Sequence, residues 1–373
     1  MRVNFVLPEE NLAGGTRVIA MYAEHLRLRG HQVVVVSRPR QLPSVRNRIK
    51  SLLTGRGWPP APPSGPSYFD PLEVEHRVVE THRPIVDRDL PDADVVVATW
   101  WETAEWVARL SPCKGAKAYL IQQLESNFPG QPADHVDATW RLPMQKIVIS
   151  QWLAEVARDR FGDSGSIIVP NAVDLDLFHA PHRGKQPRPT VGFLYAADSP
   201  HKGTATALAV IDNASPRIPG LHVRAFGFDD LRTSAPLPPG SEYFRRPPQH
   251  TLRDIYAGCD VWLCTSTSEG HHLPPHEAMA CRCPVVSTKV GGPIDLVEDG
   301  VTGYLLDVND VDGLTSRLIK VLELPEPAWQ RMSEAAYDSV KNFTWDRATD
   351  LFEQALEVSI ARFASGARRQ SQL

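Results

Sequence analysis

The sequence predicts an α/β protein with two domains, each built on a parallel sheet flanked by helices. Three observations support this fold class. Short apolar segments alternate with amphipathic segments from Val3 onward, as in repeated β-α-β units. The same alternation starts again at Val191, after a polar segment with prolines at 183–189. The length of 373 residues also suits two domains of common size.

The composition argues against several classes of protein. A formal charge of −4 is not that of a general nucleic-acid binder. The chain opens on a strand-like run and not on a signal peptide, and no segment is long and apolar enough to span a bilayer. The five cysteines include no C-x-x-C pair, so we expect reduced thiols in a cytoplasmic protein, at most peripheral to the inner membrane face.

The first half begins with a predicted strand at Val3–Leu7. A helix is expected over about 16–29, because apolar residues recur there at helical spacing, and Gly30 is a natural stop. Gly14, Gly15 and Thr16 follow the strand, and we expect the two glycines in a loop that a ligand can approach closely. A tight turn without a ligand explains them equally well. The G-x-G-x-x-G fingerprint of dinucleotide sites is absent.

The segment 38–58 is basic, with six lysines and arginines and no acidic residue. One interpretation is a weak contact with anionic lipid or a phosphorylated acceptor. The other, which we favour, is a solvated surface helix. Its basic residues are Arg38, Arg40, Arg46, Arg48, Lys50 and Arg56.

Further strands are expected at Val95–Ala98, Tyr119–Ile121, Ile147–Ile149 and Ile167–Val169. Trp100 follows the first of these and suits either packing or a sugar face. Asp92 and Asp94 stand at the amino end of the same strand, the wrong end for a ligand in a parallel sheet, so we expect no metal there. A helix over 151–161 has Ser150 as its expected cap.

The second half restarts with a strand at Val191–Tyr195. Lys202 stands at the following strand-to-helix turn, where a lysine can neutralise a diphosphate. Helices are expected near 252–258, 311–323, 327–341 and 345–363.

The most informative stretch begins with the apolar run Val261–Cys264, which predicts a buried strand. A loop carries Glu269, and prolines predict a helix start near Pro274, which places Glu277 in the first turn. Helix N-termini attract anions, and carboxylates accept from sugar hydroxyls. The stretch therefore predicts a nucleotide-sugar site. Solvated or dipole-complementing acids are the alternative.

The order Glu269, seven residues, Glu277, Ala-Met-Ala and then Gly291-Gly292-Pro293 resembles the signature of the retaining glycosyltransferases of family GT4. The resemblance implies the GT-B fold: two Rossmann-like domains facing across a cleft, with a C-terminal helix crossing back to the first domain. It implies an N-terminal acceptor domain at 1–170 with the helix 345–373, and a C-terminal donor domain at 171–344.

The resemblance also implies roles for residues. Glu269 would contact the donor sugar, Glu277 the ribose and Lys202 the diphosphate. The family arginine five residues before the lysine is Ala197 here. Either Arg245 or Arg246 is a candidate to replace its charge, and we take Arg246 as the donor-binding one. Many members have glycine where this chain has His272. The remaining donor-binding candidates are Gly270, His271 and Leu273.

The first-domain candidates rest on the same resemblance. The family histidine near Gln122–Phe128 is missing, and the string there is similar to a bacterial subgroup that includes rhamnosyltransferases. Candidates for the acceptor or sugar cleft are Gly14, Gly15, Thr16, Trp100, Gln123, Glu125 and Asn171. A hydrogen-bonded loop without a ligand is the alternative for Gln123 and Glu125.

The implied activity is a metal-independent, retaining transfer of a sugar from a nucleoside diphosphate to a hydroxyl acceptor, which is a glycan, a lipid-linked or a small molecule. No cofactor besides the donor is expected, and no nucleic acid. Two alternatives stay open: a nucleotide-sugar epimerase on the same scaffold, and a non-catalytic nucleotide-sugar-binding protein.

Overall fold

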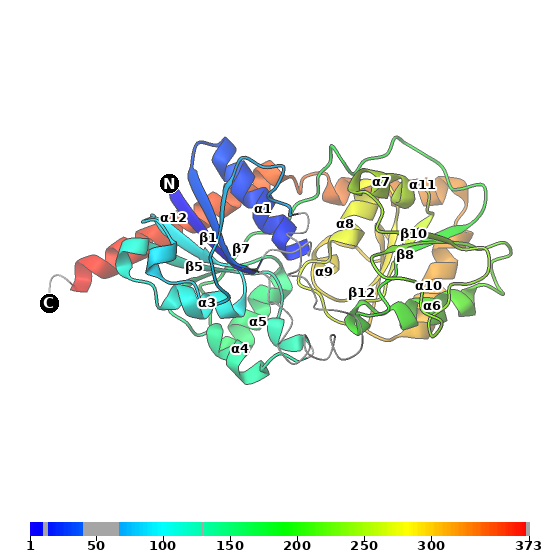
Figure 1. Ribbon diagram of the computed structural model, residues 1–373. Coiled ribbons are helices and arrows are strands. Elements are labelled where there is room, and N and C mark those ends of the chain that lie inside the picture. Colours follow the sequence, from blue (N-terminus) through cyan, green and yellow to red (C-terminus); the bar gives the residue numbers. More distant parts are fainter. Residues whose placement is uncertain (10–13, 40–66, 129, 371–373) are drawn as a thin grey trace, which may run out of the picture. The chain divides into compact units, whose positions relative to one another are not determined.

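The computed structural model describes residues 1–9, 14–39, 67–128 and 130–370. The chain divides into two compact units, shown in Figure 1. Unit 1 comprises Met1–Val148, Ala157–Val169 and Thr349–Leu373, and unit 2 comprises Ile149–Val156 and Pro170–Ala348. No helix among the described residues is long and apolar enough to cross a membrane. Nearly all of the basic segment 38–58 lies outside the described residues.

Unit 1 contains a parallel sheet with the strand order β3-β2-β1-β4-β5-β6-β7. Its central strands are short runs of β-branched residues that are buried on both faces, as helices covering both sides of a sheet require. The strands are β1 (Arg2–Glu9), β2 (Gln32–Arg38), β3 (Glu75–Val78), β4 (Val95–Ala98), β5 (Ala116–Ile121), β6 (Gln145–Val148) and β7 (Ile167–Ile168). The connecting helices are α1 (Gly14–Leu28), α3 (Trp101–Ala108), α4 (Ala133–Thr139) and α5 (Gln151–Phe161), and the part of α5 up to Val156 is assigned to unit 2.

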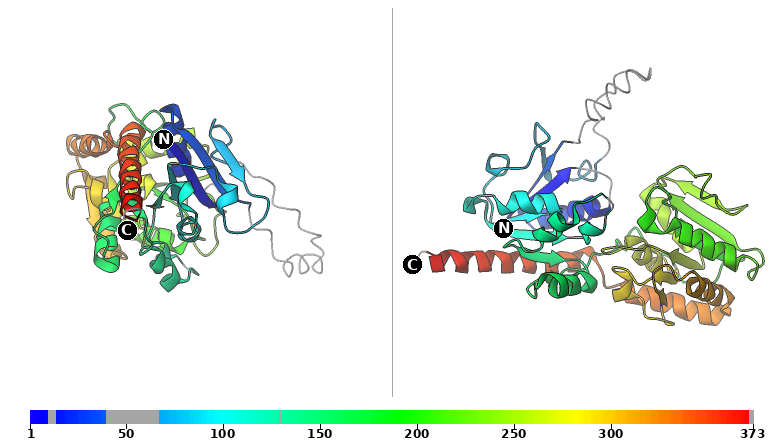
Figure 2. Two further views of the ribbon diagram at one scale, coloured as in Figure 1. Left: turned by 90° about the vertical axis from the view of Figure 1, so that its left-hand side faces the viewer. Right: turned by 90° about the horizontal axis from the view of Figure 1, so that it is seen from below.

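The last helix, α12 (Trp345–Gln370), completes unit 1, as Figure 2 shows in two views. The ring of Phe352 stacks on that of Tyr22 in α1, with 4.4 Å between centroids. Arg29 forms ion pairs with Asp350 at 2.7 Å and with Glu353. The expected return of the C-terminal helix to the first unit is therefore confirmed.

Unit 2 repeats the architecture, with the strand order β10-β9-β8-β11-β12-β13. The strands are β8 (Thr190–Leu194), β9 (His222–Gly227), β10 (Glu242–Arg245), β11 (Val261–Cys264), β12 (Val285–Thr288) and β13 (Gly303–Leu306). The helices are α6 (Thr204–Ala214), α7 (Gln249–Ala257), α8 (Leu273–Ala280), α9 (Pro293–Leu296), α10 (Val311–Glu323) and α11 (Glu326–Val340). In Figure 1, α6 and α10 lie on one side of this sheet, and α7 and α8 lie on the other.

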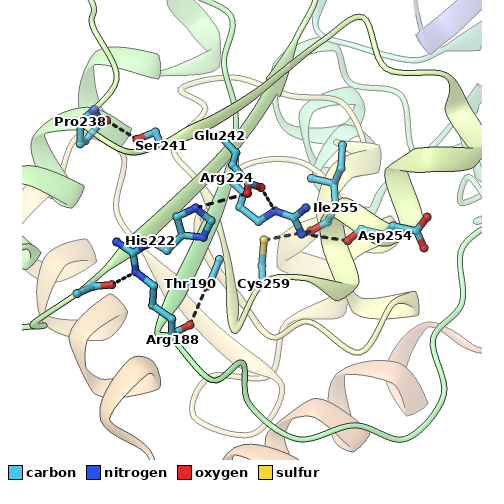
Figure 3. A network of polar contacts seen from close by, with 11 residues as sticks. Arg188, Thr190, His222, Arg224, Pro238, Ser241, Glu242, Asp254, Ile255 and Cys259 are labelled. Atoms are coloured by element: carbon cyan, nitrogen blue, oxygen red, sulfur yellow. Dashed lines mark hydrogen bonds and ion pairs between the residues drawn. The ribbon is translucent and has the colours of Figure 1, made fainter.

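Arg224 links the edge strand β10 to α7 by hydrogen bonds, as Figure 3 shows. Its Nε donates to Glu242 on the edge strand β10 at 2.9 Å. Its Nη1 donates to the carbonyl oxygen of Asp254, near the end of α7, at 3.1 Å. Gly258 leaves room for this contact, because an added Cβ would lie 1.6 Å from Arg224 Nη1.

The strand order reverses direction between β1 and β4 in unit 1, and between β8 and β11 in unit 2. At such a switch point, the loops that follow the two neighbouring strands diverge and leave a crevice at the carboxyl edge of the sheet. The candidate site residues should therefore be sought on the loops after these four strands.

Candidate active site

The strongest candidate site in unit 2 lies at its switch point. Lys202 ends a short 3₁₀ turn, Pro200–Lys202, in the connection after β8. Glu269 lies in the loop after β11, on the other side of the switch point. The Nζ of Lys202 and the Oε1 of Glu269 are 2.8 Å apart. The fold thus brings together the two residues that the resemblance assigns to the diphosphate and the donor sugar.

The two loops are held against each other by backbone contacts. The hydroxyl of Thr265 donates to the carbonyl oxygen of Gly203 at 2.8 Å, and the amide of Thr267 donates to that of His201 at 2.8 Å. Gly203 has a φ of 71°, and an added Cβ would lie 1.9 Å from the Thr265 oxygen. A glycine is therefore needed directly after Lys202 for this close approach.

Glu269 is a buried carboxylate with three neighbours. Besides Lys202, the hydroxyl of Ser266 donates to Oε1 at 2.8 Å, and the Nε2 of His272 lies 3.8 Å away. Burial alone would raise the pKa of Glu269, but the protonated form of His272, the charge of Lys202 and the two hydrogen bonds outweigh it, so the pKa is lowered. Glu269 is therefore ionised at neutral pH.

Gly291 and Gly292 explain the later part of the motif. Gly291 has a φ of 54°, and an added Cβ would lie 2.7 Å from the carbonyl oxygen of Glu269 and 2.8 Å from that of Gly270. The amide of Gly292 donates to the carbonyl oxygen of His271 at 2.9 Å. The glycine pair thus packs directly against the loop that carries Glu269.

Glu277 is the fifth residue of α8, which begins at Leu273, so the expectation that it lies in the first turn is wrong. The helix begins one residue earlier than expected, because His272 already occupies the N-cap position. Glu277 is buried, and its Oε2 accepts from the hydroxyl of Tyr256 at 2.8 Å. A hydrogen bond from α7 thus orients this carboxylate.

Three histidines crowd the start of α8. The rings of His271 and His276 stack, with 4.0 Å between their centroids. Burial lowers the pKa of His271 to about 3 and that of His272 to about 4, so both are neutral at pH 7. His272 has a φ of 65°, in the left-handed region that favours glycine. The described residues contain no group of histidines, cysteines and acids arranged to hold a metal ion.

Arg246 follows β10, at the same carboxyl edge of the sheet, with a φ of 46°. Its side chain is exposed, and its Nε donates to the carbonyl oxygen of Phe228 at 2.9 Å. Ala197, in the position of the family arginine, packs against the core of unit 2. Whether Arg246 replaces the missing charge stays a prediction.

In unit 1, Gly14, Gly15 and Thr16 form the first turn of α1, so the expectation that the two glycines lie in a loop is wrong. The side chain of Gln122, after β5, donates to the carbonyl oxygen of Gly15 at 3.2 Å. An added Cβ on Gly15 would lie 3.3 Å from the Gln122 amide nitrogen, so the close approach here is made by a side chain of the same unit.

Glu125 lies inside unit 1. Its Oε2 accepts from the amide of Trp101, at the start of α3, at 2.7 Å and from the hydroxyl of Tyr119 at 3.0 Å. Burial raises the pKa of Glu125 to about 8. These internal contacts agree with the alternative that Glu125 belongs to a hydrogen-bonded loop without a ligand. A role of Glu125 toward a ligand stays a prediction.

The other cleft candidates differ in their surroundings. Trp100 is half-buried, with its ring 5.9 Å from that of Phe128. The Oε1 of Gln123 and the Oδ1 of Asn171 are buried and have no hydrogen-bond partner among the described residues. Buried acceptors of this kind are unusual, so both are suited to accept from a ligand or a water molecule.

Ser266 and Tyr256 orient the two glutamates and were not among the residues predicted from the sequence. Ser266 stands three residues before Glu269, and this spacing was a local signal. Tyr256 lies 21 residues from Glu277, and only the packing of α7 against α8 brings the two together.

The two-sheet architecture is the GT-B fold. The chain is similar in structure to Anabaena HepE in complex with UDP-glucose, with a TM-score of 0.72, 16% identity, and coverage of 96% of this chain and 100% of that one. It is also similar to sucrose-phosphate synthase from Thermosynechococcus elongatus, with a TM-score of 0.70, 16% identity, and coverage of 97% and 100%.

Residues 181–339 match the family described as glycosyl transferases group 1. The chain is 35% identical over 124 residues to D-inositol 3-phosphate glycosyltransferase from Mycobacterium avium, and 34% identical over 99 residues to sucrose synthase from Acidithiobacillus caldus. These matches cover 33% and 26% of this chain but only 29% and 12% of the relatives. The similarity is therefore to group 1 glycosyltransferases in general and not specifically to rhamnosyltransferases.

Proposed function

We propose that this protein is a retaining glycosyltransferase that moves a sugar from a nucleoside diphosphate to a hydroxyl acceptor. The observation that carries the proposal is the pair of Lys202 and Glu269 at the switch point of the second sheet, 2.8 Å apart. A cation and an ionised acid beside the start of α8 provide what a sugar diphosphate needs, namely charge relief for the phosphates and an acceptor for sugar hydroxyls.

Each residue of the site has a distinct role in this proposal. Lys202 and the positive end of the α8 dipole stabilise the negative charge of the departing diphosphate; of the first three residues of α8 only Leu273 has an amide N–H, because the other two are prolines. Glu269 accepts from hydroxyls of the donor sugar, and Glu277 accepts from the ribose. Neither glutamate attacks the sugar: a phosphate oxygen of the leaving group takes the proton of the acceptor hydroxyl on the same face. The charge relief comes from the chain itself, so the proposal requires no metal ion.

The acceptor belongs to unit 1 in this proposal, which assigns residues 1–170 and 345–373 to an acceptor domain and 171–344 to a donor domain. Trp100 offers a half-buried ring, and the Oε1 of Gln123 is a buried acceptor without a partner among the described residues. Both features suit a molecule with several hydroxyl groups.

A donor assay with purified protein tests the proposal. UDP-glucose is the first probe, because the structurally similar HepE was solved with it, and ADP-glucose and GDP-mannose follow. Slow release of free sugar and nucleoside diphosphate supports transfer. A product inverted at C2 supports an epimerase, and a raised melting temperature without turnover supports a binding protein. If no donor is turned over and none raises the melting temperature, all three functions are refuted.

Replacing Glu269 tests the site itself. Glu269→Ala is expected to lower the rate of donor turnover at least about 100-fold, the effect of losing one strong polar contact to a transition state. Glu323→Ala, which removes an exposed acid on α10 of the same unit, is the matched control and should keep the full rate. A near-normal rate in Glu269→Ala, with the fold retained in circular dichroism, removes Glu269 from the reaction.

A further inference from the structure

In the proposed reaction Lys202 is a partner of two anionic groups, the carboxylate of Glu269 and the diphosphate. Lys202 forms the ion pair with Glu269, and the same ammonium group is the one proposed to bind the diphosphate. The side chain of Lys202 keeps 26% of its surface exposed, whereas that of Glu269 keeps only 9%. An entering diphosphate can therefore draw the lysine outward, while the carboxylate stays buried.

Glu269 would then keep the Ser266 hydroxyl but lose its cation. A buried carboxylate without a compensating charge is strongly unfavourable, and it would turn away or take up a proton. Either change would spoil its contacts with the donor sugar. The site needs a second donor that can approach Glu269 when the lysine leaves.

His272 is placed to be that donor. Its Nε2 lies 3.8 Å from the Oε1 of Glu269, just beyond hydrogen-bonding distance, and its side chain is 3% exposed. Its Nδ1 has no hydrogen-bond partner among the described residues, so no such bond at this nitrogen opposes a small rotation of the ring. Its left-handed backbone would be less strained with glycine, so an imidazole at this position has a cost that a function would explain.

We infer that His272 is a positioning residue that donates its Nε2–H to Glu269 when a diphosphate takes Lys202. The inference rests on the proposed function, because it assigns the diphosphate to that lysine. In the ligand-free protein Lys202 holds Glu269, and in the occupied site His272 holds it. The carboxylate keeps one orientation throughout.

Four further titratable groups of the described residues near His272 and Glu269 are uncharged at neutral pH. His201, on the turn with Lys202, has a pKa lowered by burial, as have His271 on the same loop and His276 on α8. Burial raises the pKa of the Cys264 thiol at the end of β11. Burial, together with the charges of Glu269 and Lys202, thus determines the protonation state of His272 at neutral pH.

Lys202→Met tests the inference without any ligand, because it removes the ammonium group as a diphosphate would. The measurement is the ¹⁵N NMR titration of the His272 ring in the full-length protein, assigned by the signal that disappears in His272→Gln. In Lys202→Met we expect the Nε2–H tautomer, a slowly exchanging ring proton, and a pKa that rises from about 4 toward the ordinary value of about 6.5.

Loss of the lysine charge alone would also raise the pKa of His272, so Lys202→Met/Glu269→Gln is the matched control. The inference requires a smaller rise in this double variant and loss of the slowly exchanging proton. An equal rise in both variants, or an Nδ1–H tautomer in Lys202→Met, would overturn it. Lys202→Gln repeats the test should Lys202→Met fold poorly. Since no donor is used, the result is independent of whether UDP-glucose is turned over.

Discussion

Glu125 and Glu269 are both buried carboxyl groups, yet their surroundings shift their pKa values in opposite directions. Glu125 receives only hydrogen bonds, from the Trp101 amide and the Tyr119 hydroxyl, and burial raises its pKa to about 8. Glu269 has the Lys202 ammonium group at 2.8 Å, and its pKa is lowered. At neutral pH Glu125 is therefore protonated and Glu269 is ionised.

The raised pKa of Glu125 predicts a pH dependence of stability. An acid whose pKa is higher in the folded than in the unfolded state stabilises the fold below the unfolded value, here about 4.5, and this stabilisation is lost as the pH rises to about 8. The loss has an upper limit of about 1.4 kcal/mol for each pH unit. Glu125→Gln, which stays neutral, should equal the native protein near pH 5 and exceed it in stability at pH 8.

Urea unfolding at the two pH values measures this difference. Glu80→Gln removes an exposed glutamate of the same unit and should leave the pH dependence of the native protein unchanged. Parallel stability curves for the native protein and Glu125→Gln would show that Glu125 does not titrate in this range.

Among the elements, helices were predicted more accurately at their centres than at their starts. The bounds of α10 agree with the sequence, and its start is fixed locally, since the side chain of Asp310 accepts from the Gly313 amide at 2.9 Å. The starts of α1 and α8 lie earlier than expected. Neither depends on a local cap alone, because Gln122 contacts the carbonyl oxygen of Gly15 from the loop after β5, and His272 adopts a left-handed backbone.

The sequence predicts those parts of the candidate site that the strand order of the sheet determines. Strand order places the loops after β8 and β11 side by side, and this placement is what joins Lys202 to Glu269. The hydrogen bond from Tyr256 to Glu277 depends on how α7 packs against α8. His272 adopts a left-handed φ of 65° in the folded loop. Neither follows from the spacing of residues along the chain.

Gly203 provides a test at the level of the loop. In Gly203→Ala the new Cβ would overlap the Thr265 carbonyl oxygen, so the turn that carries Lys202 must shift. We expect a loss of about 2 to 4 kcal/mol in the free energy of unfolding and weaker binding of UDP-glucose. Both can be followed by thermal denaturation with and without the donor.

Gly240→Ala is the matched control, because Gly240 has a similar φ of 79° and no atom within 4 Å of an added Cβ. It should cost about 1 kcal/mol from backbone strain alone and leave donor binding intact. Equal effects of the two substitutions on UDP-glucose binding would show that contact with Thr265 does not position Lys202.

At the scale of the whole molecule, unit 1 is discontinuous in sequence. Its core receives Phe352 from α12, which is fully buried and stacks on Tyr22. The ion pairs of Arg29 with Asp350 and Glu353 fasten the same part of the helix. Unit 1 therefore depends for its stability on residues that follow unit 2 in the chain, whereas unit 2 has its own core.

Phe352→Ala should accordingly affect one unit and spare the other. We expect a loss of about 3 to 5 kcal/mol from unit 1, as for other buried phenylalanines. Scanning calorimetry should show one transition moving to lower temperature and another staying in place. Phe363→Ala, which removes a partly exposed ring from the same helix, should cost less than about 1 kcal/mol. A uniform shift of all transitions would mean that the two units unfold together.

The late position of α12 has a consequence for biosynthesis. A ribosome translates the sheet of the N-terminal unit first, but the helix that finishes its core emerges only after the whole C-terminal unit has been made. Unit 2 can reach its native state while unit 1 still exposes the apolar residues that pack against Phe352. During that interval, the nascent chain is expected to be a client of chaperones that bind exposed apolar surface.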